Sequence, residues 1–242
     1  MTGVVAYDRE DAGAPPSLVP DYRSTVLRSP RQPLVRIPAT LTETSGPTGH
    51  WERLMVGPSG IDMTTQHPGA PQGQRIVVSG RVLDDRGRPV PNTVIEIWQA
   101  NAAGRYVHSA DTWDAPLDPN FTGAGRVVTD AEGRYRYVTI RPGAYPWGNH
   151  KNAWRPGHIH LSLLGPAFAT RLVTQMYFPD DPLIEIDPIA NAVPMPYRQR
   201  MVGRFDIDTS VPAWALGYLF DIVLKGRDET PFEPDAGDDH DH

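Results

Sequence analysis

From Gln74 onward, the sequence alternates between short β-branched or aromatic runs and clusters of turn residues. This alternation constrains the fold more than any other feature. Strands are expected at residues 76–83, 94–99, 127–129, 134–140, 158–164, 171–178 and 218–224. The cluster Asp130-Ala131-Glu132-Gly133 predicts a turn that joins its two flanking strands as a hairpin. Short strands separated by turn signals are typical of a β-sandwich. We therefore expect an all-β fold with a β-sandwich core, long coil arms and loops, and little helix.

Residues 1–70 are rich in Pro, Ser, Thr and Arg and show weak periodicity, so they cannot easily form a core of their own. The alternatives are a disordered segment and an extended N-terminal arm packed on a partner subunit. The apolar residues Leu34, Val35, Ile37 and Leu41 favour the arm, which we expect. A β-sandwich domain is expected at 71–234, followed by an acidic disordered tail at 235–242, for which metal binding is the alternative. The best helix candidate, Ala190 to Val202, is interrupted by Pro194 and Pro196.

Charge and composition exclude several classes of function. The net charge of −6 and the lack of a Lys/Arg run argue against a nucleic-acid partner. The chain has no cysteine, so any metal must be held by His, carboxylate or Tyr side chains. The first ten residues lack a leader pattern, and no stretch approaches ~18 apolar residues, so we expect a cytoplasmic protein without membrane contact.

His158 and His160 lie two residues apart at the start of an expected strand. Residues i and i+2 of a strand point to the same face, so the two imidazoles form half of a potential metal site. Pro156 and Gly157 precede the pair, and glycine permits close approach of the backbone to a bound group. The alternative is that both histidines bond to backbone groups at the end of a sheet.

Tyr106 and Tyr145 lie in Gly-containing loops after expected strands, where functional residues often collect. Each could instead be an ordinary packing residue. A phenolate is a hard anionic oxygen donor that suits Fe³⁺ better than Zn²⁺ or Cu⁺. Two phenolates and a hydroxide would neutralise Fe³⁺, so the site could be buried without a large penalty.

These segments, with others along nearly the whole chain, resemble the beta subunits of protocatechuate 3,4-dioxygenase, a family of intradiol ring-cleavage enzymes. The matching stretches are 20–22, 28–32, 98–101, 104–106, 117–121, 145–147, 154–160, 175–178 and 220–224. The resemblance implies one non-haem Fe(III) per chain, held with a water or hydroxide by Tyr106, Tyr145, His158 and His160. It also implies that substrate displaces Tyr145, which the residues alone do not distinguish from Tyr106.

The resemblance implies further roles around this iron. Arg155 is expected to stabilise anionic substrate and intermediates, as a catalytic residue together with Tyr145. Gln175 is expected to be a polar group behind the ligands. The expected substrate-pocket residues are Tyr22, Trp147, Gln175 and Ile189. The alternative for Arg155 is a surface position before the strand. The alternative for each of the other residues is ordinary packing.

The implied reaction converts protocatechuate (3,4-dihydroxybenzoate) and O₂ to 3-carboxy-cis,cis-muconate. The implied partner is a homologous alpha subunit without its own iron, which forms an alpha-beta protomer in a larger oligomer. The alternatives are an intradiol enzyme acting on catechol, hydroxyquinol or gallate, and a non-catalytic transthyretin-like or carbohydrate-binding β-sandwich.

Overall fold

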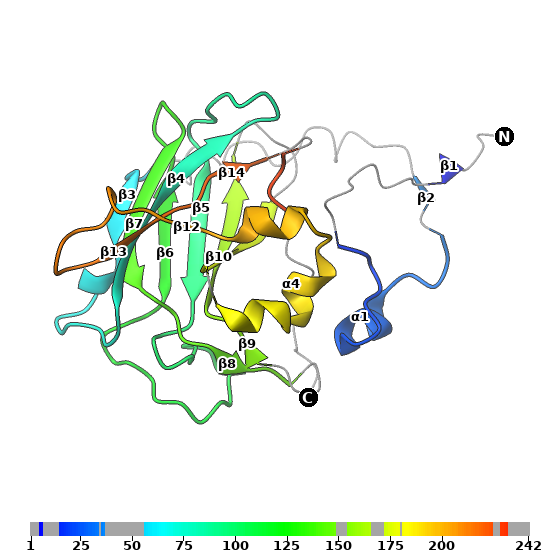
Figure 1. The fold of residues 1–242 in the computed structure, drawn as a ribbon, viewed down its shortest axis with the longest axis horizontal. Coiled ribbons are helices and arrows are strands. Elements are labelled where there is room, and N and C mark those ends of the chain that lie inside the picture. The colour runs from blue at the N-terminus through cyan, green and yellow to red at the C-terminus, as the bar shows by residue number, and fades with distance from the viewer. Residues whose placement is uncertain are drawn as a thin grey trace.

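The computed structural model describes residues 5–6, 15–33, 35–36, 56–148, 154–165, 172–179, 181–224 and 228–231. The expected acidic tail, 235–242, lies outside these residues. Two β-sheets face each other and form a sandwich, as the sequence predicts (Figure 1). No helix in the described part of the chain is long and apolar enough to cross a membrane.

The larger sheet has six strands, in the order β12-β13-β4-β7-β3 with β14 also paired to β4. Its strands are β3 (Gly60–Asp62), β4 (Arg75–Leu83), β7 (Arg134–Ile140), β12 (Arg204–Phe205), β13 (Leu216–Leu219) and β14 (Ile222–Val223). The single strand expected at 218–224 is two short strands, because the chain leaves the ladder at Phe220 and Asp221 and rejoins it beside the end of β4.

The smaller sheet has four strands, in the order β11-β10-β5-β6. Its strands are β5 (Val94–Gln99), β6 (Ala124–Val128), β10 (His158–Leu164) and β11 (Leu172–Tyr177). The hairpin expected around residues 130–133 is therefore wrong. The turn forms, with the amide of Asp130 bonded to the carbonyl of Arg134, but its flanking strands enter different sheets. Because β6 and β7 lie in different sheets, the apolar faces of both strands point into the one core between the sheets.

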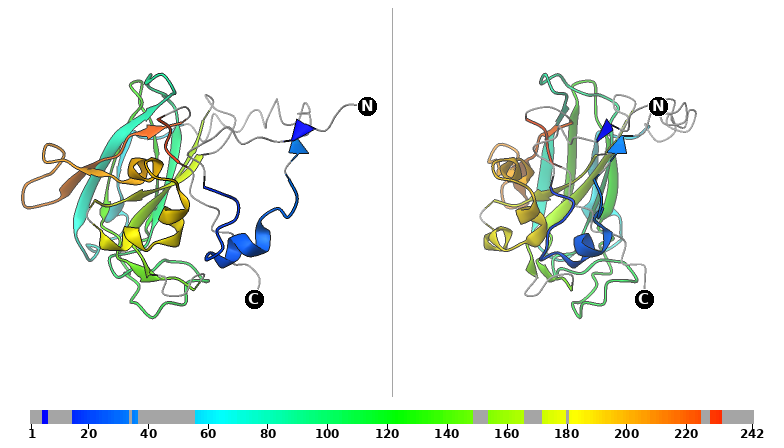
Figure 2. Two further views of the ribbon diagram at one scale, coloured as in Figure 1. Left: turned by 45° about the vertical axis from the view of Figure 1, so that its right-hand side comes forward. Right: turned by 90° about the vertical axis from the view of Figure 1, so that its right-hand side faces the viewer.

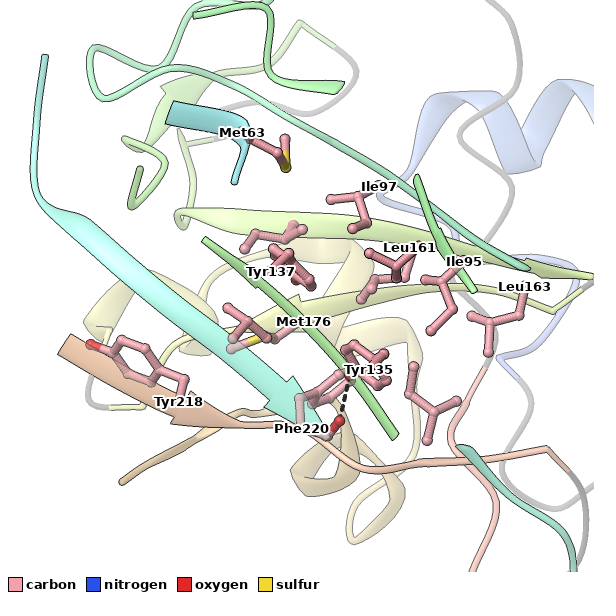
Figure 3. Packing of buried hydrophobic residues seen from close by; sticks show 14 of the residues in the cluster. Met63, Ile95, Ile97, Tyr135, Tyr137, Leu161, Leu163, Met176, Tyr218 and Phe220 are labelled. Carbon is pink, nitrogen blue, oxygen red and sulfur yellow. Dashed lines mark hydrogen bonds between the residues drawn. The ribbon is translucent and has the colours of Figure 1, made fainter. Parts of the chain in front are cut away.

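The core between the sheets follows the two-residue period of the strands. Ile76 and Val78 of β4 face Ile95 and Ile97 of β5 and the apolar side of β10. Figure 3 shows Ile95 and Ile97 of β5 and Leu161 of β10 in this core, together with the two buried tyrosines of β7, Tyr135 and Tyr137. Tyr135 donates its hydroxyl proton to the carbonyl of Phe220, which satisfies a polar group that would otherwise be costly to bury.

The helices in the described part of the chain are short. They are α1 (Arg23–Arg28), η1 (Met63–Thr65), η2 (Pro182–Glu185), α4 (Pro188–Ala192) and η3 (Tyr197–Met201). The best helix candidate, 190–202, contains two short pieces, α4 and η3, and Pro194 and Pro196 lie in the break between them, as the sequence predicts. Asp187 begins α4 by accepting bonds from the amides of Ile189 and Ala190, and Pro188 fits the first helical turn.

Two further pairs of short strands lie outside the sandwich. They are β1 (Val5–Ala6) with β2 (Val35–Arg36), and β8 (Tyr145–Pro146) with β9 (Trp154–Arg155). Figure 1 shows β8 and β9 at one end of the sandwich, close to α4, and Figure 2 shows α1, β1 and β2 beside the sheets.

The segment 1–70, expected to be an arm, contains structure of two kinds. Its end belongs to the sandwich, because β3 pairs with β7 and Met63 of η1 is buried in the core. Its described part at 15–33 instead lies beside the sandwich and contains α1. The sandwich therefore begins about ten residues earlier than the turn-and-strand pattern indicates.

Candidate metal centre

The site lies on the face of the four-stranded sheet that points away from the core. In β10, Ile159, Leu161 and Leu163 point into the core cluster. His158 and His160 alternate with them and therefore share the opposite face, as the sequence predicts. Both histidines are nevertheless buried. The short helices and the β8–β9 pair near this end of the sandwich provide their surroundings (Figure 1).

The two imidazoles are oriented as a pair of metal ligands would be. The Nε2 atoms of His158 and His160 are 3.2 Å apart. Zinc–imidazole bonds are about 2.0–2.1 Å long, so two such nitrogens at a right angle around a metal would be about 3 Å apart. Nδ1 of His158 lies 2.8 Å from the carbonyl oxygen of Pro156, which can only accept a hydrogen bond. Nδ1 therefore carries the proton, and Nε2 presents its lone pair to the site.

Two tyrosines from separate loops approach this pair. The Tyr145 hydroxyl is 3.4 Å from Nε2 of His158. The Tyr106 ring meets the Tyr145 ring edge-on, with centroids 5.5 Å apart, and its centroid is 6.3 Å from that of His160. The structure thus brings together the four residues that the sequence nominates as ligands. Two imidazoles with two phenols form a donor set that fits Fe³⁺.

Carboxylates do not complete this donor set. No group of three or more His, Cys, Asp or Glu side chains suited to a metal occurs among the described residues. The phenols of Tyr106 and Tyr145 are the oxygen donors that lie near His158 and His160. This composition separates the site from the common zinc sites, which use His, Cys and carboxylate ligands.

Arg155 is the charged group next to the histidines. It is only 2% exposed, and it lies opposite Tyr145 in the β8–β9 pair. Its Nη1 donates to Nε2 of His158 at 3.1 Å, so a metal at that nitrogen would compete for the same lone pair. Burial, then the positive charge of Arg155 and the proximity of His160, hold the pKa of His158 well below its ordinary value. His158 is therefore neutral, as a metal ligand must be.

A buried carboxylate fixes Arg155. Nε and Nη2 of Arg155 donate to the two carboxylate oxygens of Asp187 at 3.2 and 2.9 Å. Nη2 also donates to Oε1 of Gln175 at 2.7 Å and to the Tyr177 hydroxyl at 3.0 Å. Burial opposes the charge on Arg155, but Asp187 and then the tyrosines outweigh it and hold its pKa well above its ordinary value. Arg155 is thus a permanently charged group in a buried position.

A cavity of about 1070 Å³ opens beside these groups. Tyr106, Tyr145, Arg155 and His160 contribute to its wall, as do Trp147 and Ile189. The remaining residues nominated from the sequence lie just behind it. Gln175 is fully buried behind Arg155, and Tyr22 is fully buried with its ring edge-on to Trp147, at a centroid distance of 4.9 Å.

Two residues next to the nominated set were not assigned a role from the sequence. Asp187 holds Arg155 from 32 positions away and could have been noticed only as a helix cap before Pro188. Trp98 stacks on His160 with centroids 4.8 Å apart and an interplanar angle of 5°. Trp98 lies directly opposite His160 in the β5–β10 ladder, a relationship that requires the strand register.

Comparison with known proteins identifies the family to which this chain belongs. A family model described as "Dioxygenase" matches residues 48–226. The chain belongs to the intradiol dioxygenase family. A second model, "Protocatechuate 3,4-dioxygenase beta subunit N terminal", matches residues 7–40. The protocatechuate 3,4-dioxygenase beta chain of Burkholderia cepacia is 59% identical over 216 residues, which cover 88% of this chain and 91% of that protein.

Other intradiol dioxygenases are more distant. The protocatechuate 3,4-dioxygenase alpha chain of Burkholderia cepacia is 30% identical over 66% of this chain and 77% of its own length. Hydroxyquinol 1,2-dioxygenase of a Rhizobium species is 33% identical, and the match covers 59% of this chain and 52% of that enzyme. The crystal structure of 3-chlorocatechol 1,2-dioxygenase from Rhodococcus opacus 1CP aligns with a TM-score of 0.53 and 25% identity, covering 67% of this chain and 64% of that one.

Proposed function

We propose that this intradiol dioxygenase chain carries one Fe(III), held by Tyr106, Tyr145, His158 and His160, and that it cleaves the ring of protocatechuate. The observation that carries the proposal is the convergence of the two tyrosine loops on a pair of histidine Nε2 atoms 3.2 Å apart. Similarity to a protocatechuate 3,4-dioxygenase beta chain over 88% of the sequence supports this substrate over catechol, hydroxyquinol or gallate. The same similarity argues against a non-catalytic binding module.

Iron bound here would act as a Lewis acid that favours the deprotonated catechol and orients it for reaction with O₂. The protein groups have separate tasks. Tyr145 lies next to His158 and opposite Arg155, so Oη of the phenolate that would bind the metal is well placed to accept a substrate proton and become a neutral phenol. Arg155 supplies a fixed positive charge next to the anion that forms. Asp187 and Gln175 hold that charge in place.

The cavity wall suits a planar aromatic substrate. Trp147 and Ile189 form apolar surface on the cavity that Tyr106 and Tyr145 also line. The guanidinium carbon of Arg155 lies 5.9 Å from the centroid of the Trp147 ring. The products of the proposed reaction are 3-carboxy-cis,cis-muconate and no other carbon fragment, with both oxygen atoms of O₂ incorporated.

The chain assembles with a homologous alpha chain, in keeping with the alpha and beta chains of the related enzymes. We propose that the N-terminal arm packs on this partner. Exposed apolar residues support this, because Leu18, Val26 and Leu27 on or before α1 are 50%, 48% and 82% exposed. Tyr22, on the same segment, is fully buried. The segment therefore connects the site to a surface that a partner can cover.

One preparation tests the proposal. The chain, co-expressed with its alpha partner, is analysed for iron, for visible absorption and for products from protocatechuate and catechol. We expect one iron per chain, a visible charge-transfer band that shifts when protocatechuate is added, and a preference for protocatechuate. An iron-loaded protein without a phenolate band would contradict the ligand assignment, and equal or better turnover of catechol would contradict the substrate.

A further inference from the structure

Asn101 lies two residues after the end of β5 and is 4% exposed. Its side chain organises the turn that leads to Tyr106. Oδ1 accepts hydrogen bonds from the amides of Ala103 and Arg105, at 2.9 and 3.0 Å. Nδ2 donates to the carbonyl oxygen of Pro116 at 2.9 Å. One buried amide thus bonds to both ends of the segment that carries Tyr106. Within the segment, the amide of Tyr106 itself donates to Oδ2 of Asp111 at 2.8 Å.

The main chain of Asn101 extends this arrangement to the second tyrosine. Its carbonyl oxygen accepts from the amide of Gly104 at 3.0 Å and from the amide of Gly143 at 2.9 Å. Gly104 lies two residues before Tyr106, and Gly143 lies two residues before Tyr145. One carbonyl therefore joins the two tyrosine loops, in each case at the glycine two residues before the tyrosine.

The two loops touch closely at these glycines. A Cβ atom on Gly104 would lie 2.2 Å from the carbonyl oxygen of Ala144, and one on Gly143 would lie 2.3 Å from that of Ala102. Gly104 also has a φ of +77°, which other residues rarely adopt. The contact is thus backbone against backbone. Backbone contacts of this kind leave little freedom to change the separation of the loops, and hence of the rings they carry.

We propose that Asn101 is a positioning residue that sets the placement of Tyr106 relative to Tyr145, and through it the geometry of the two phenol ligands. The inference rests on the proposed function, because it concerns the metal site assigned there. Without its side chain, two amides and one carbonyl of the Tyr106 loop lose their partner. The loop then has several conformations of similar energy, and the phenol is no longer held ready for the metal.

Asn101→Ala and Asn101→Asp separate the contribution of the acceptor Oδ1 from that of the donor Nδ2. Alanine removes all three side-chain bonds. Aspartate keeps the acceptor for Ala103 and Arg105 but places an oxygen against the carbonyl of Pro116. Changing a residue that orients a metal ligand typically weakens metal binding about 10–100-fold. We expect a loss in this range and a shifted phenolate–iron band for Asn101→Ala, with a smaller effect for Asn101→Asp.

Thr129→Val is the matched control. Thr129 is also a buried residue that pins a turn, because its hydroxyl accepts from the amide of Thr93 at 2.9 Å and donates to Val90 at 2.8 Å. Thr129 directly follows the last residue of β6. It lies at the far end of the β5–β6 pair from Trp98, because Val94 pairs with Val128 and Trp98 pairs with Ala124. Thr129→Val should lower the melting temperature and leave the iron affinity and the phenolate band unchanged.

The assembled protein with its alpha partner is used, with iron content, visible spectrum and melting temperature measured on each variant. If Asn101→Ala loses stability but keeps the wild-type iron affinity and band, Asn101 is a loop residue only and the inference is wrong. If Asn101→Ala does not fold, the test is made on Asn101→Asp. A wild-type phenolate–iron band and iron affinity in Asn101→Asp would likewise show that the inference is wrong. A wild-type protein without any phenolate–iron band would instead overturn the proposed function.

Discussion

Arg155 and Asp187 form a buried ion pair, with Nη2 and Oδ2 2.9 Å apart and side-chain exposures of 2% and 0%. The carboxylate also accepts the amide bonds that begin α4, and α4 carries Ile189 into the cavity wall. One aspartate thus connects the charge next to His158 with a wall of the proposed substrate pocket. Pairs of this kind are not strongly stabilising in themselves, but the loss of one partner leaves a buried charge uncompensated.

Asp187→Asn tests this connection. The amide can keep part of the hydrogen bonding but not the negative charge, so Arg155 becomes an unpaired buried cation. Breaking a buried pair typically costs about 3–5 kcal/mol, and we expect a loss of unfolding free energy approaching this range together with a large loss of turnover. Chemical denaturation and steady-state kinetics on iron-loaded protein measure the two effects.

The control for this change is Asp228→Asn. Asp228 pairs with Arg200 at 3.3 Å, but its side chain is 72% exposed. Exposed pairs contribute about 0–1 kcal/mol, so this variant should be close to wild type in stability and turnover. Equal effects of the two substitutions would show that burial of the Asp187 pair has no special role.

Arg155→Lys tests the fixed charge itself. Replacement by leucine would strand the Asp187 carboxylate, whereas lysine keeps a cation for it. Lysine cannot reproduce the planar set of bonds to Asp187, Gln175 and Tyr177. We expect normal iron content and a phenolate band, with turnover lower by about 10²-fold or more, the usual scale for a lost electrostatic stabiliser. A near-normal rate at full iron loading would give Arg155 a structural role only.

The sequence predicts the fold class and the His pair because both depend on local periodicity. The alternation of Ile159 and Leu161 with His158 and His160 is enough to place the imidazoles on one face. The approach of Tyr106 and Tyr145 is not a local property. It depends on loops that follow different strands, and the two tyrosines are assigned as ligands only by resemblance to a family.

Other features were missed because sequence patterns do not report sheet membership or distant partners. The turn at Asp130 has the composition and the bonds of a hairpin turn, yet β6 and β7 leave it for different sheets. Asp187 has the pattern of a helix cap, and this role is real, but its second role requires Arg155 to be adjacent in space. Tertiary packing decides both outcomes.

His160→Ala tests the metal ligands. His160 contributes one of the two Nε2 atoms that lie 3.2 Å apart, and its loss opens one coordination position. We expect loss of most bound iron, of the visible band and of activity. His67→Ala is the control, because His67 is bonded to Thr122 in an exposed pair, and it should keep all three. Full iron and turnover in His160→Ala would remove His160 from the ligand set.

The last prediction concerns the arm and the alpha partner. Leu27 is 82% exposed on α1, whereas Tyr22, one residue before the helix, is buried against Trp147. If the exposed side of α1 is covered by the alpha chain, a charge placed there must be buried without a partner, which is costly. Leu27→Glu should therefore weaken assembly of the co-expressed chains.

Arg86→Glu is the control for this change, because Arg86 is exposed on the turn after β4, on the sandwich and not on the arm. Size-exclusion chromatography with light scattering, and activity measured on the same fractions, distinguish the outcomes. We expect smaller species with lower activity for Leu27→Glu, since the arm reaches the pocket wall through Tyr22. A Leu27→Glu protein of wild-type size and activity would mean that α1 faces solvent in the assembly, and the partner would then have to bind elsewhere on the chain.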